Sequence, residues 1–318
     1  MDDEKLKLIS MADIAAQEVK WLWYPYVPIG KITILQGDPG EGKTMLALSL
    51  AASLTQGLPL PEQTEALPPS TVVYQTAEDG LADTIKPRLE KAGADCTRVV
   101  VIDDSSSPLS FSDSRIEEAI VKSKARLFIL DPLQAFLGAD VDMHRANEVR
   151  PTFRKLAGMA DRTDCAILII GHLNKMSMAK GIYRGLGSVD IPAVARSILY
   201  VGRSKSDEDK RYMAQLKNSL APLGQTLTFQ INDTLCFDGV SPLSAEQLMS
   251  NCIYDFKPTK RDNAVVAIEE LLSEGEKPCI AVYEYCLAQG ISKRTVDKAK
   301  QELGVISRKR NDRWYWSL

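Results

Sequence analysis

A glycine-rich segment between two apolar runs constrains this chain more than any other feature of its sequence. Residues 37–44 fit the pattern G-x4-G-K-[ST], with a short β-branched run at 32–35 before them and a helix-prone run at 45–54 after them. Glycines let backbone N–H groups converge on phosphate oxygens, and the N-terminus of the following helix adds a partial positive charge. The segment therefore predicts a phosphate-binding loop. The alternative is a tight strand–helix turn without a ligand.

The side chains of this loop indicate what it binds. Lys43 is expected to reach the β- and γ-phosphates of ATP, and the Thr44 hydroxyl is expected to bind Mg²⁺. The residues expected to bind ATP are Gly37, Asp38, Pro39, Gly40, Glu41, Gly42, Lys43, Thr44 and Met45. The sequence therefore predicts ATP and Mg²⁺ as the cofactors.

A later apolar run supplies a candidate metal ligand. Residues 126–130 form the run, and Asp131 follows it directly. In a chain with a phosphate-binding loop, a carboxylate at the end of a buried strand is placed to order the hydration shell of Mg²⁺. Thr44 and Asp131 are thus the two expected metal-site residues.

Two carboxylates follow the strand predicted at residues 72–76. We expect this strand to lie next to the strand of the phosphate-binding loop, where Glu78 would polarise the attacking water as general base. Asp79 is the second choice for this role. The alternative is that both carboxylates cap the helix that starts near Leu81.

A histidine and a basic segment follow the strand predicted at residues 165–170. His172 stands at the end of this strand, where ligands of parallel sheets bind, so we expect it to sense the γ-phosphate. Residues 173–187 then carry Lys175, Lys180 and Arg184 together with an aromatic residue and glycines, a composition that suits contact with single-stranded DNA. The alternatives are a structural histidine and a mobile solvent loop.

Two further basic residues lie on or after late predicted strands. Arg203 and Lys217 are candidates to reach the γ-phosphate bound by a neighbouring subunit and to stabilise the charge of the transition state. Arg196 could replace Arg203 in this role. Surface ion pairing is the alternative interpretation for both residues.

The pattern along residues 26–250 predicts a parallel sheet covered by helices, after an N-terminal segment at 1–25. Short apolar runs alternate with amphipathic segments, and most runs are continuous, which is typical of strands buried on both faces. Strands are expected at 31–36, 71–76, 99–102, 127–130, 165–170 and 198–201, with edge or antiparallel additions at 211–217 and 225–231.

Residues 260–318 predict a small winged-helix domain. Helices are expected at 263–273, 280–288 and 292–303, where Ser292 is the N-cap, followed by strands at 305–309 and 313–316. Residues 291–318 hold eight Lys and Arg against three Asp and Glu. Candidate DNA contacts are Lys293, Arg294, Lys298, Arg308, Lys309 and Arg310. A solvated surface or a protein-docking unit are the alternatives.

The composition of the chain bears on its partners, on metal binding by cysteine and on its location in the cell. The whole chain has a formal net charge of −3, so its overall charge favours no partner. Its six cysteines include no C-x-x-C pair and it has two histidines, which argues against zinc and for reduced thiols. An acidic N-terminus and the lack of a long apolar run predict a cytoplasmic protein without membrane contact.

Together these motifs resemble a known family. Residues 37–44, 76–80, 130–133, 171–175, 187–188, 195–197 and 217–218 resemble the RepA-type hexameric helicases of plasmids and the related AAA-type ATPases of phages, within the RecA/DnaB superfamily. The resemblance implies an α/β fold, with a RecA-like P-loop NTPase core and a mostly parallel central sheet. It also implies ATP sites between the subunits of a hexameric ring. One departure is that Asn218 and Ser219 follow Lys217, whereas DnaB-type rings place an Arg two positions after the Lys.

The resemblance favours an ATP-hydrolysing motor that moves on single-stranded DNA, most simply a replicative DNA helicase of a mobile element. In that reading Lys43 and Thr44 bind nucleotide, Glu78 is the base, Asp131 holds Mg²⁺ and His172 is the sensor. Two alternatives stay open from the sequence. One is an ATP-switched regulator or helicase loader whose winged helix reads duplex DNA, and the other is a recombination ATPase of the RecA/RadA type.

Overall fold

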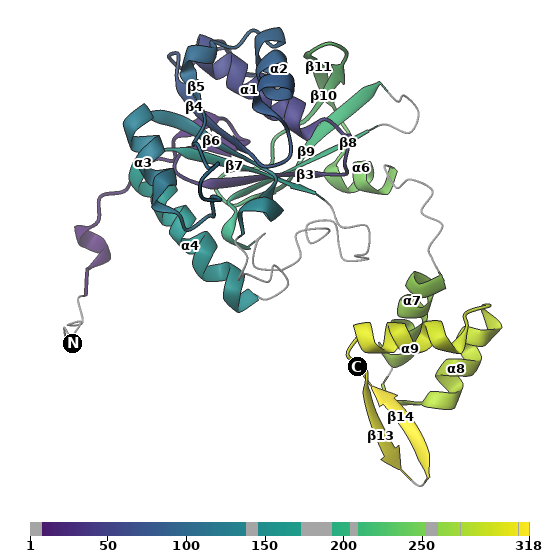
Figure 1. Cartoon of the computed structure of the whole chain (residues 1–318). Helices are drawn as coiled ribbons and strands as arrows, with labels where there is room; N and C mark the ends of the chain where they lie inside the picture. Colours follow the sequence, from purple (N-terminus) through teal and green to yellow (C-terminus); the bar gives the residue numbers. More distant parts are fainter. Residues whose placement is uncertain are drawn as a thin grey trace. The chain divides into compact units, whose positions relative to one another are not determined.

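The computed structural model describes residues 8–137, 146–172, 193–203, 209–251, 260–273, 275–310 and 312–317. Contacts between Cα atoms divide the chain into two compact units, Met1–Cys252 and Ile253–Leu318 (Figure 1). None of the helices in the described ranges combines the length and the apolar character needed to cross a bilayer.

The first unit is built on a sheet of nine strands within the described residues. In spatial order the strands are β11 (Leu235–Ser241), β10 (Thr226–Ile231), β9 (Lys210–Asn218), β8 (Ser197–Arg203), β3 (Ile32–Gly37), β7 (Ala166–His172), β6 (Ala125–Asp131), β4 (Thr71–Thr76) and β5 (Val99–Val100). The strands from β8 to β5 are parallel, and β9, β10 and β11 each pair antiparallel with their neighbour. The expected mostly parallel sheet is confirmed.

Two details of the sheet differ from the sequence expectations. Strand β4 was expected beside β3, but β7 and β6 lie between them. The chain continues from β4 to β5 at the outer edge, and β6 and β7 then fill the space between β4 and β3. Strand β11 was not predicted. Most of its side chains are exposed or half-buried, so its sequence lacks the apolar run that identified the other strands.

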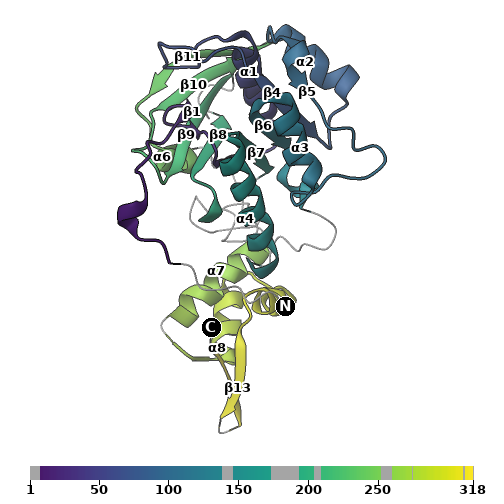
Figure 2. The same cartoon turned by 90° about the vertical axis from the view of Figure 1, so that its left-hand side faces the viewer.

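Helices cover both faces of the parallel strands, with α1 (Lys43–Gln56) and α2 (Lys86–Lys91) on one face and α3 (Ser114–Ser123) and α4 (Ala146–Thr163) on the other (Figures 1 and 2). Alternate residues of each strand face opposite helical layers. In β6, Leu127 packs in the cluster that includes α1, whereas Phe128 packs in the cluster that includes α3 and α4. Burial of both faces explains why the strands read as continuous apolar runs.

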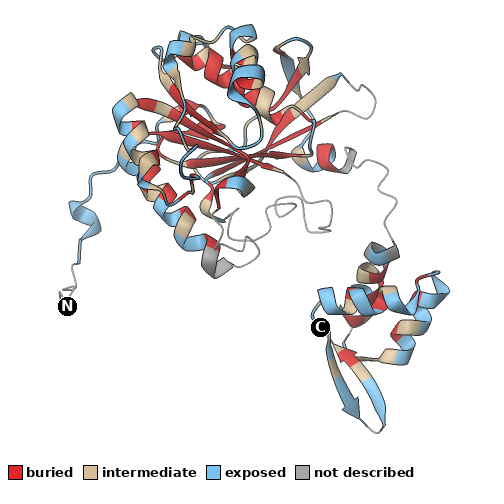
Figure 3. Cartoon of the chain, viewed as in Figure 1, coloured by how far each residue is buried: buried red, intermediate tan, exposed pale blue. Residues whose placement is uncertain are grey.

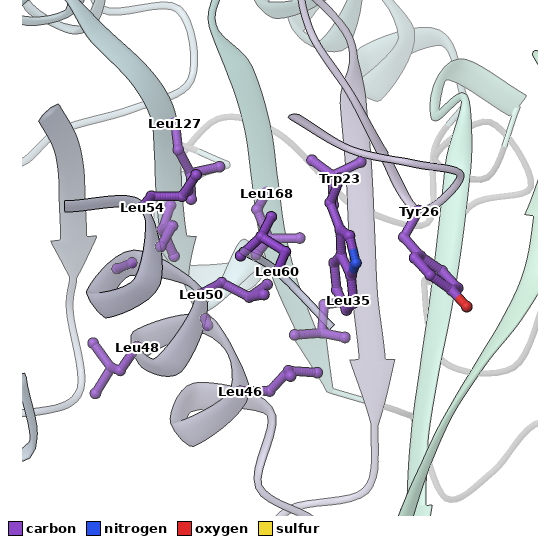
Figure 4. Packing of buried hydrophobic residues seen from close by; sticks show 14 of the residues in the cluster. Trp23, Tyr26, Leu35, Leu46, Leu48, Leu50, Leu54, Leu60, Leu127 and Leu168 are labelled. Atoms are coloured by element: carbon purple, nitrogen blue, oxygen red, sulfur yellow. The ribbon is translucent and has the colours of Figure 1, made fainter. Parts of the chain in front are cut away.

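Helix α1 is held to the sheet by leucines spaced four residues apart. Leu46, Leu50 and Leu54 are buried and lie against sheet residues such as Leu35 and Leu168 (Figure 4). Burying each leucine contributes about 1.5–3 kcal/mol. The helix ends at Gly57, whose left-handed backbone, with φ of 66°, bonds back to the last turn. This packing fixes the direction of the helix N-terminus, which adjoins the glycine-rich loop.

A short antiparallel pair, β1 (Trp21–Trp23) and β2 (Val27–Pro28), precedes the sheet and joins its core. Trp23 is fully buried and its indole N–H donates to the Pro61 carbonyl at 2.9 Å. Tyr26 is 2% exposed and its hydroxyl donates to the Gln225 carbonyl at 2.7 Å. Burial, with a smaller effect of the nearby Glu62, raises the pKa of Tyr26 to about 12.

On the other side of the sheet, α6 (Ala245–Asn251) packs against β8 and β9.

The second unit has its own apolar core. Its helices are α7 (Lys260–Ser273), α8 (Cys279–Ala288) and α9 (Lys293–Glu302), and an antiparallel sheet runs in the order β12 (Lys277–Pro278), β14 (Arg313–Ser317) and β13 (Ile306–Arg310). Ile268, Val282 and Trp316 are buried between these elements. Figure 3 shows buried segments on the helices and the hairpin of this unit. The Ser292 hydroxyl accepts the Thr295 backbone N–H, which confirms the expected N-cap of α9. The expected helices and hairpin are present, and β12 is an addition to them.

Candidate nucleotide-binding site

The glycine-rich loop joins β3 to α1 and is shaped by two requirements for glycine. Gly42 has a φ of 95°, in the left-handed region, and a Cβ there would lie 2.2 Å from Ile231 Cδ1. A Cβ on Gly37 would lie 2.3 Å from the Val201 carbonyl oxygen of the neighbouring strand. Gly42 is also the N-cap of α1 and offers no side chain to the first backbone N–H groups of the helix. These N–H groups are therefore placed to receive an anion.

Lys43 lies folded over the loop that precedes it. Its side chain is buried, and Nζ donates to the carbonyl oxygens of Gly37 and Asp38, each at 2.8 Å. Burial lowers the pKa of Lys43, while the nearby Asp131 acts in the opposite direction. A buried ammonium that is satisfied only by carbonyls gains from a stronger, anionic partner. Lys43 is therefore positioned to exchange these carbonyls for phosphate oxygens.

Asp131 is buried and accepts hydrogen bonds from two hydroxyl groups, one on the half-buried Thr44 and one on the buried Tyr74. Its Oδ2 accepts the Thr44 hydroxyl at 2.7 Å and the Tyr74 hydroxyl at 3.1 Å. Burial raises the pKa of Asp131, and the two hydroxyl donors partly offset this. A cation would offset it further, and carboxylate and hydroxyl oxygens are ligands suited to Mg²⁺. The Asp131 and Thr44 side chains therefore fit the expected metal.

Tyr74 is a residue of this site that sequence reasoning missed. Burial raises its pKa well above the usual value, with Asp131 as the next cause, so the hydroxyl stays protonated and donates. The signal available in the sequence was a single tyrosine within an apolar strand run. Its importance follows from the strand order, because β4 pairs with β6 so that Thr76 lies opposite Asp131 and Tyr74 lies opposite Ile129.

Glu78 and His172 meet at the carboxyl edge of the sheet. Glu78 Oε2 lies 3.6 Å from His172 Nε2, although Glu78 follows β4 and His172 is the last residue of β7. The Glu78 side chain is 60% exposed and the His172 side chain is 31% exposed, so the pair borders solvent next to the buried Asp131. The Nδ1 atom of His172 is buried and has no hydrogen-bond partner among the described residues.

Asp79, the second choice for the base, is engaged elsewhere. It pairs with Arg88 of α2 at 3.1 Å. Thr76 Oγ1 accepts the backbone N–H groups of Glu78 and Asp79, each at 3.3 Å, and this turn aims Glu78 toward His172. The helical segment that follows begins after Gly80 without a side-chain cap. The alternative in which both carboxylates cap that helix is therefore wrong.

The Arg203 side chain contacts the glycine-rich loop of its own chain. Its Nη2 donates to the Gly40 carbonyl at 3.3 Å, and its Nε lies 3.7 Å from Glu41 Oε2. The expectation placed Arg203 on the nucleotide of a neighbouring subunit. Its observed position follows from the sheet, since β8 is parallel to β3 and the two strands end side by side. Arg211 is a residue that sequence reasoning missed. It stands opposite Arg203 in the register of β8 and β9, and its side chain lies beside Gly42 of the same loop.

Glu41 is enclosed between these arginines and the loop. Its side chain is 3% exposed. Burial raises the pKa of Glu41, and Arg203 and Arg211 oppose the rise. The carboxylate therefore ties the end of the β8–β9 pair to the loop at a cost in desolvation.

Lys217 lies far from this loop within its own chain. It pairs with Ile198, the second residue of β8, so it sits toward the amino edge of the sheet rather than at the carboxyl edge. Its Nζ donates to the Ala195 carbonyl at 2.8 Å. Burial and the nearby Arg196 lower the pKa of Lys217. The two residues expected to reach the γ-phosphate of a neighbouring subunit, Arg203 and Lys217, thus lie toward opposite edges of the sheet.

The structure describes only some of the residues that were expected to contact DNA. Lys175, Lys180 and Arg184 lie outside the described residues. In the second unit, Arg294, Lys298 and Arg308 are exposed, and none of the three pairs with a described acidic residue. The other three candidate residues of this unit have partners. Lys293 Nζ lies 5.0 Å from the centre of the Tyr283 ring. Lys309 pairs with Asp312 at 3.0 Å, and Arg310 pairs with Glu276 at 2.9 Å.

Comparisons with known proteins agree with the phosphate-binding geometry. The model of a family described as AAA domain matches residues 4–178, a range that contains the loop, Glu78, Asp131 and His172. The chain is 24% identical over 157 residues to the DNA repair protein RadA of Streptococcus pneumoniae, and 28% identical over 155 residues to that of Halalkalibacterium halodurans. Each match covers 48% of this chain but only 32% and 30% of the relatives, so the chain spans about a third of their length.

Proposed function

Since this chain belongs to the AAA domain family, we propose that it is a Mg²⁺-dependent ATPase that works on DNA. The observation that carries the proposal is the buried group in which Thr44 and Tyr74 both donate to Asp131, next to Lys43 and a glycine-rich helix N-terminus. Phosphate ligands, metal ligands and a candidate base thereby converge on one edge of the sheet.

Binding of ATP would exchange contacts that already exist within the site. Lys43 would leave the Gly37 and Asp38 carbonyls for the phosphate oxygens, and the first N–H groups of α1 would receive the same anion. Mg²⁺, held by Thr44 and Asp131, would neutralise charge that develops on the phosphates. Tyr74 would keep Asp131 oriented toward the metal.

Glu78 would act as the general base on the attacking water. The carboxylate takes the proton from water while the oxygen attacks the γ-phosphorus and the bond to the β-phosphate oxygen breaks. His172, 3.6 Å from Glu78, would interact with the γ-phosphate and respond to its loss. Because His172 directly precedes residues 173–187, a change at its side chain is placed to reach the basic segment proposed to contact DNA.

We further propose that the ATPase is a ring-forming motor on single-stranded DNA, most simply a replicative helicase of a plasmid or phage. In such a ring Lys217 would act on the site of a neighbouring subunit, because its place toward the amino edge of the sheet keeps it from the glycine-rich loop of its own chain. The second unit, with three helices and a basic hairpin, would be a winged helix that holds DNA through Arg294, Lys298 and Arg308.

A recombination ATPase is the second candidate, and the similarity to RadA proteins favours it. Both candidates require single-stranded DNA to stimulate hydrolysis, but they differ in assembly and in what hydrolysis achieves. A motor of this kind forms closed rings and separates strands, whereas a recombination ATPase promotes pairing of a single strand with a duplex.

The test is the steady-state ATPase rate with no DNA, with single-stranded DNA and with duplex DNA, followed by a strand-separation assay on a forked duplex. We expect single strands to stimulate hydrolysis more than duplex does, and unwinding to require hydrolysis. Stimulation without unwinding, together with strand pairing, would favour the recombination ATPase. A slow rate that ignores single strands would contradict both and favour an ATP-switched regulator.

A further inference from the structure

A basic pocket of about 390 Å³ lies at the edge of the sheet opposite to the glycine-rich loop. Its walls come from the beginnings of two parallel strands, with Thr71 at the start of β4 and Arg126 at the start of β6. The end of α3 contributes Lys124, and the turn before β5 contributes Arg98. Neither the proposed ATP site nor the proposed DNA surfaces include these residues.

The lining carries positive charge that the described protein does not neutralise. Arg98, Lys124 and Arg126 line the pocket, and no Asp or Glu does. Arg98 pairs with Asp95, with Nε 3.2 Å from Oδ2. Lys124 and Arg126 pair with no acidic residue among those described. Two uncompensated cations in one concavity raise the local concentration of anions and strengthen their binding.

Regular backbone structure fixes the Cα positions of both basic residues, although the Lys124 side chain is exposed. Arg126 is half-buried in β6 between the buried Ala125 and Leu127. Lys124 is the C-cap of α3 with a φ of 53°, and its N–H bonds to the Ile120 and Val121 carbonyls. The backbone of the pocket therefore needs no rearrangement when a ligand binds, and only the two side chains have to be ordered.

We propose that this pocket binds a phosphate group, with Arg126 and Lys124 as its principal ligands. The fork of an arginine matches the geometry of phosphate oxygens, and an ammonium adds a point charge. The volume lies near the lower end of the range for small-molecule sites, about 300–1,000 Å³, so one or two phosphate groups fit better than a long polymer. The phosphate could belong to a free phosphorylated molecule or to a nucleic-acid backbone.

The test uses pyrophosphate as the probe, with calorimetry on the full chain carrying Lys43→Ala to weaken binding at the glycine-rich loop. We expect saturable binding in this background. Adding Arg126→Gln and Lys124→Asn should weaken the binding at least about tenfold, since each removes a charged ligand. Asparagine also tolerates the left-handed backbone at position 124. Lys122→Gln, which removes an exposed lysine outside the pocket that pairs with Glu118, should leave the affinity unchanged.

Absence of saturable binding, or equal weakening by the pocket variants and by Lys122→Gln, would overturn the proposal. If Arg126→Gln does not fold, Lys124→Asn alone should still weaken the binding several-fold, because it removes one charged ligand, and unchanged binding by that variant would overturn the proposal. Competition by a mononucleotide but not by a short single-stranded oligonucleotide would identify a free phosphorylated ligand, and the reverse would identify a nucleic-acid backbone. ATP hydrolysis by the pocket variants in the chain that retains Lys43 should continue, so failure of this proposal is distinct from failure of the proposed function.

Discussion

The glycine-rich loop of the first unit and the surface of the second unit carry positive charge in opposite ways. In the first unit, Lys43 is buried, has two hydrogen bonds and lies near the Asp131 carboxylate. In the second unit, Arg294, Lys298 and Arg308 are exposed and pair with no acidic residue among those described. A buried charge acts over short distances in a fixed geometry and is screened little by salt, whereas exposed charges act together and are screened strongly. The first unit is thus suited to chemistry at one point, and the second to contact with an extended polyanion.

The largest effect should come from removing the buried charge. Lys43→Ala should lower the rate of ATP hydrolysis by at least about 100-fold, because it removes a preorganised charge from the transferred phosphate. The loss should be similar at low and high salt. The rate measured between 50 and 300 mM salt, with Lys122→Gln as the matched exposed control, tests this expectation. A loss that grows steeply with salt would mean that Lys43 acts like a surface charge.

A smaller loss should follow removal of one hydroxyl next to the metal site. Tyr74→Phe keeps the buried ring but leaves Asp131 with one fewer donor, and such support of a metal ligand is typically worth about 10–100-fold. The concentration of Mg²⁺ that gives half-maximal hydrolysis should therefore rise about tenfold. An unchanged Mg²⁺ dependence would mean that Thr44 alone orients Asp131.

The glycine-rich loop and Asp131 could be predicted from sequence because each signal is local. The loop needs glycines at fixed spacing, and Asp131 needs only an apolar run that ends in a carboxylate. Glu78 and His172 could be proposed from the sequence because each stands at or just after the end of a predicted strand of one parallel sheet, and the carboxyl ends of such strands share an edge. Tyr74 and Arg211 could not be found in this way. Their roles depend on which strands are neighbours and in which register, and the prediction that placed β4 beside β3 was wrong.

The exposed charges of the second unit should contribute modestly and in a salt-dependent way. Arg294→Ala combined with Lys298→Ala should reduce DNA affinity several-fold and lower the slope of log affinity against log salt by about 2, or about 1 for each phosphate contact. Fluorescence anisotropy with a labelled oligonucleotide between 50 and 200 mM salt gives this slope. Lys309→Ala is the matched control, because Lys309 already pairs with Asp312 and should contribute less. Equal effects of paired and unpaired residues would contradict the contrast drawn between the units.

The smallest effect concerns Glu41. Burial raises its pKa in the folded chain, so the folded state favours the protonated carboxyl. Stability that is present below the ordinary pKa of glutamate is then lost as the pH rises through the raised pKa. The Gln side chain in Glu41→Gln cannot ionise, so this variant should lose less stability as the pH rises. Its melting temperature at neutral pH should exceed that of the wild type by about 2 °C. Thermal unfolding at pH 4, 5, 6 and 7 without nucleotide provides the comparison. A Glu41→Gln variant that is less stable at every pH would show that its ion pairs outweigh desolvation.

In the proposed mechanism Glu78, and not its neighbour Asp79, activates water beside a nucleotide held by residues 37–44. The most direct measurement is the hydrolysis rate, together with the affinity for a fluorescent ATP analogue, for wild type, Glu78→Gln and Asp79→Asn. Glu78→Gln should bind the analogue normally and lose at least about 100-fold in rate, whereas Asp79→Asn should keep most of the rate because Asp79 pairs with Arg88. Near-normal hydrolysis by Glu78→Gln, or a larger loss in Asp79→Asn with the fold intact, would contradict the account.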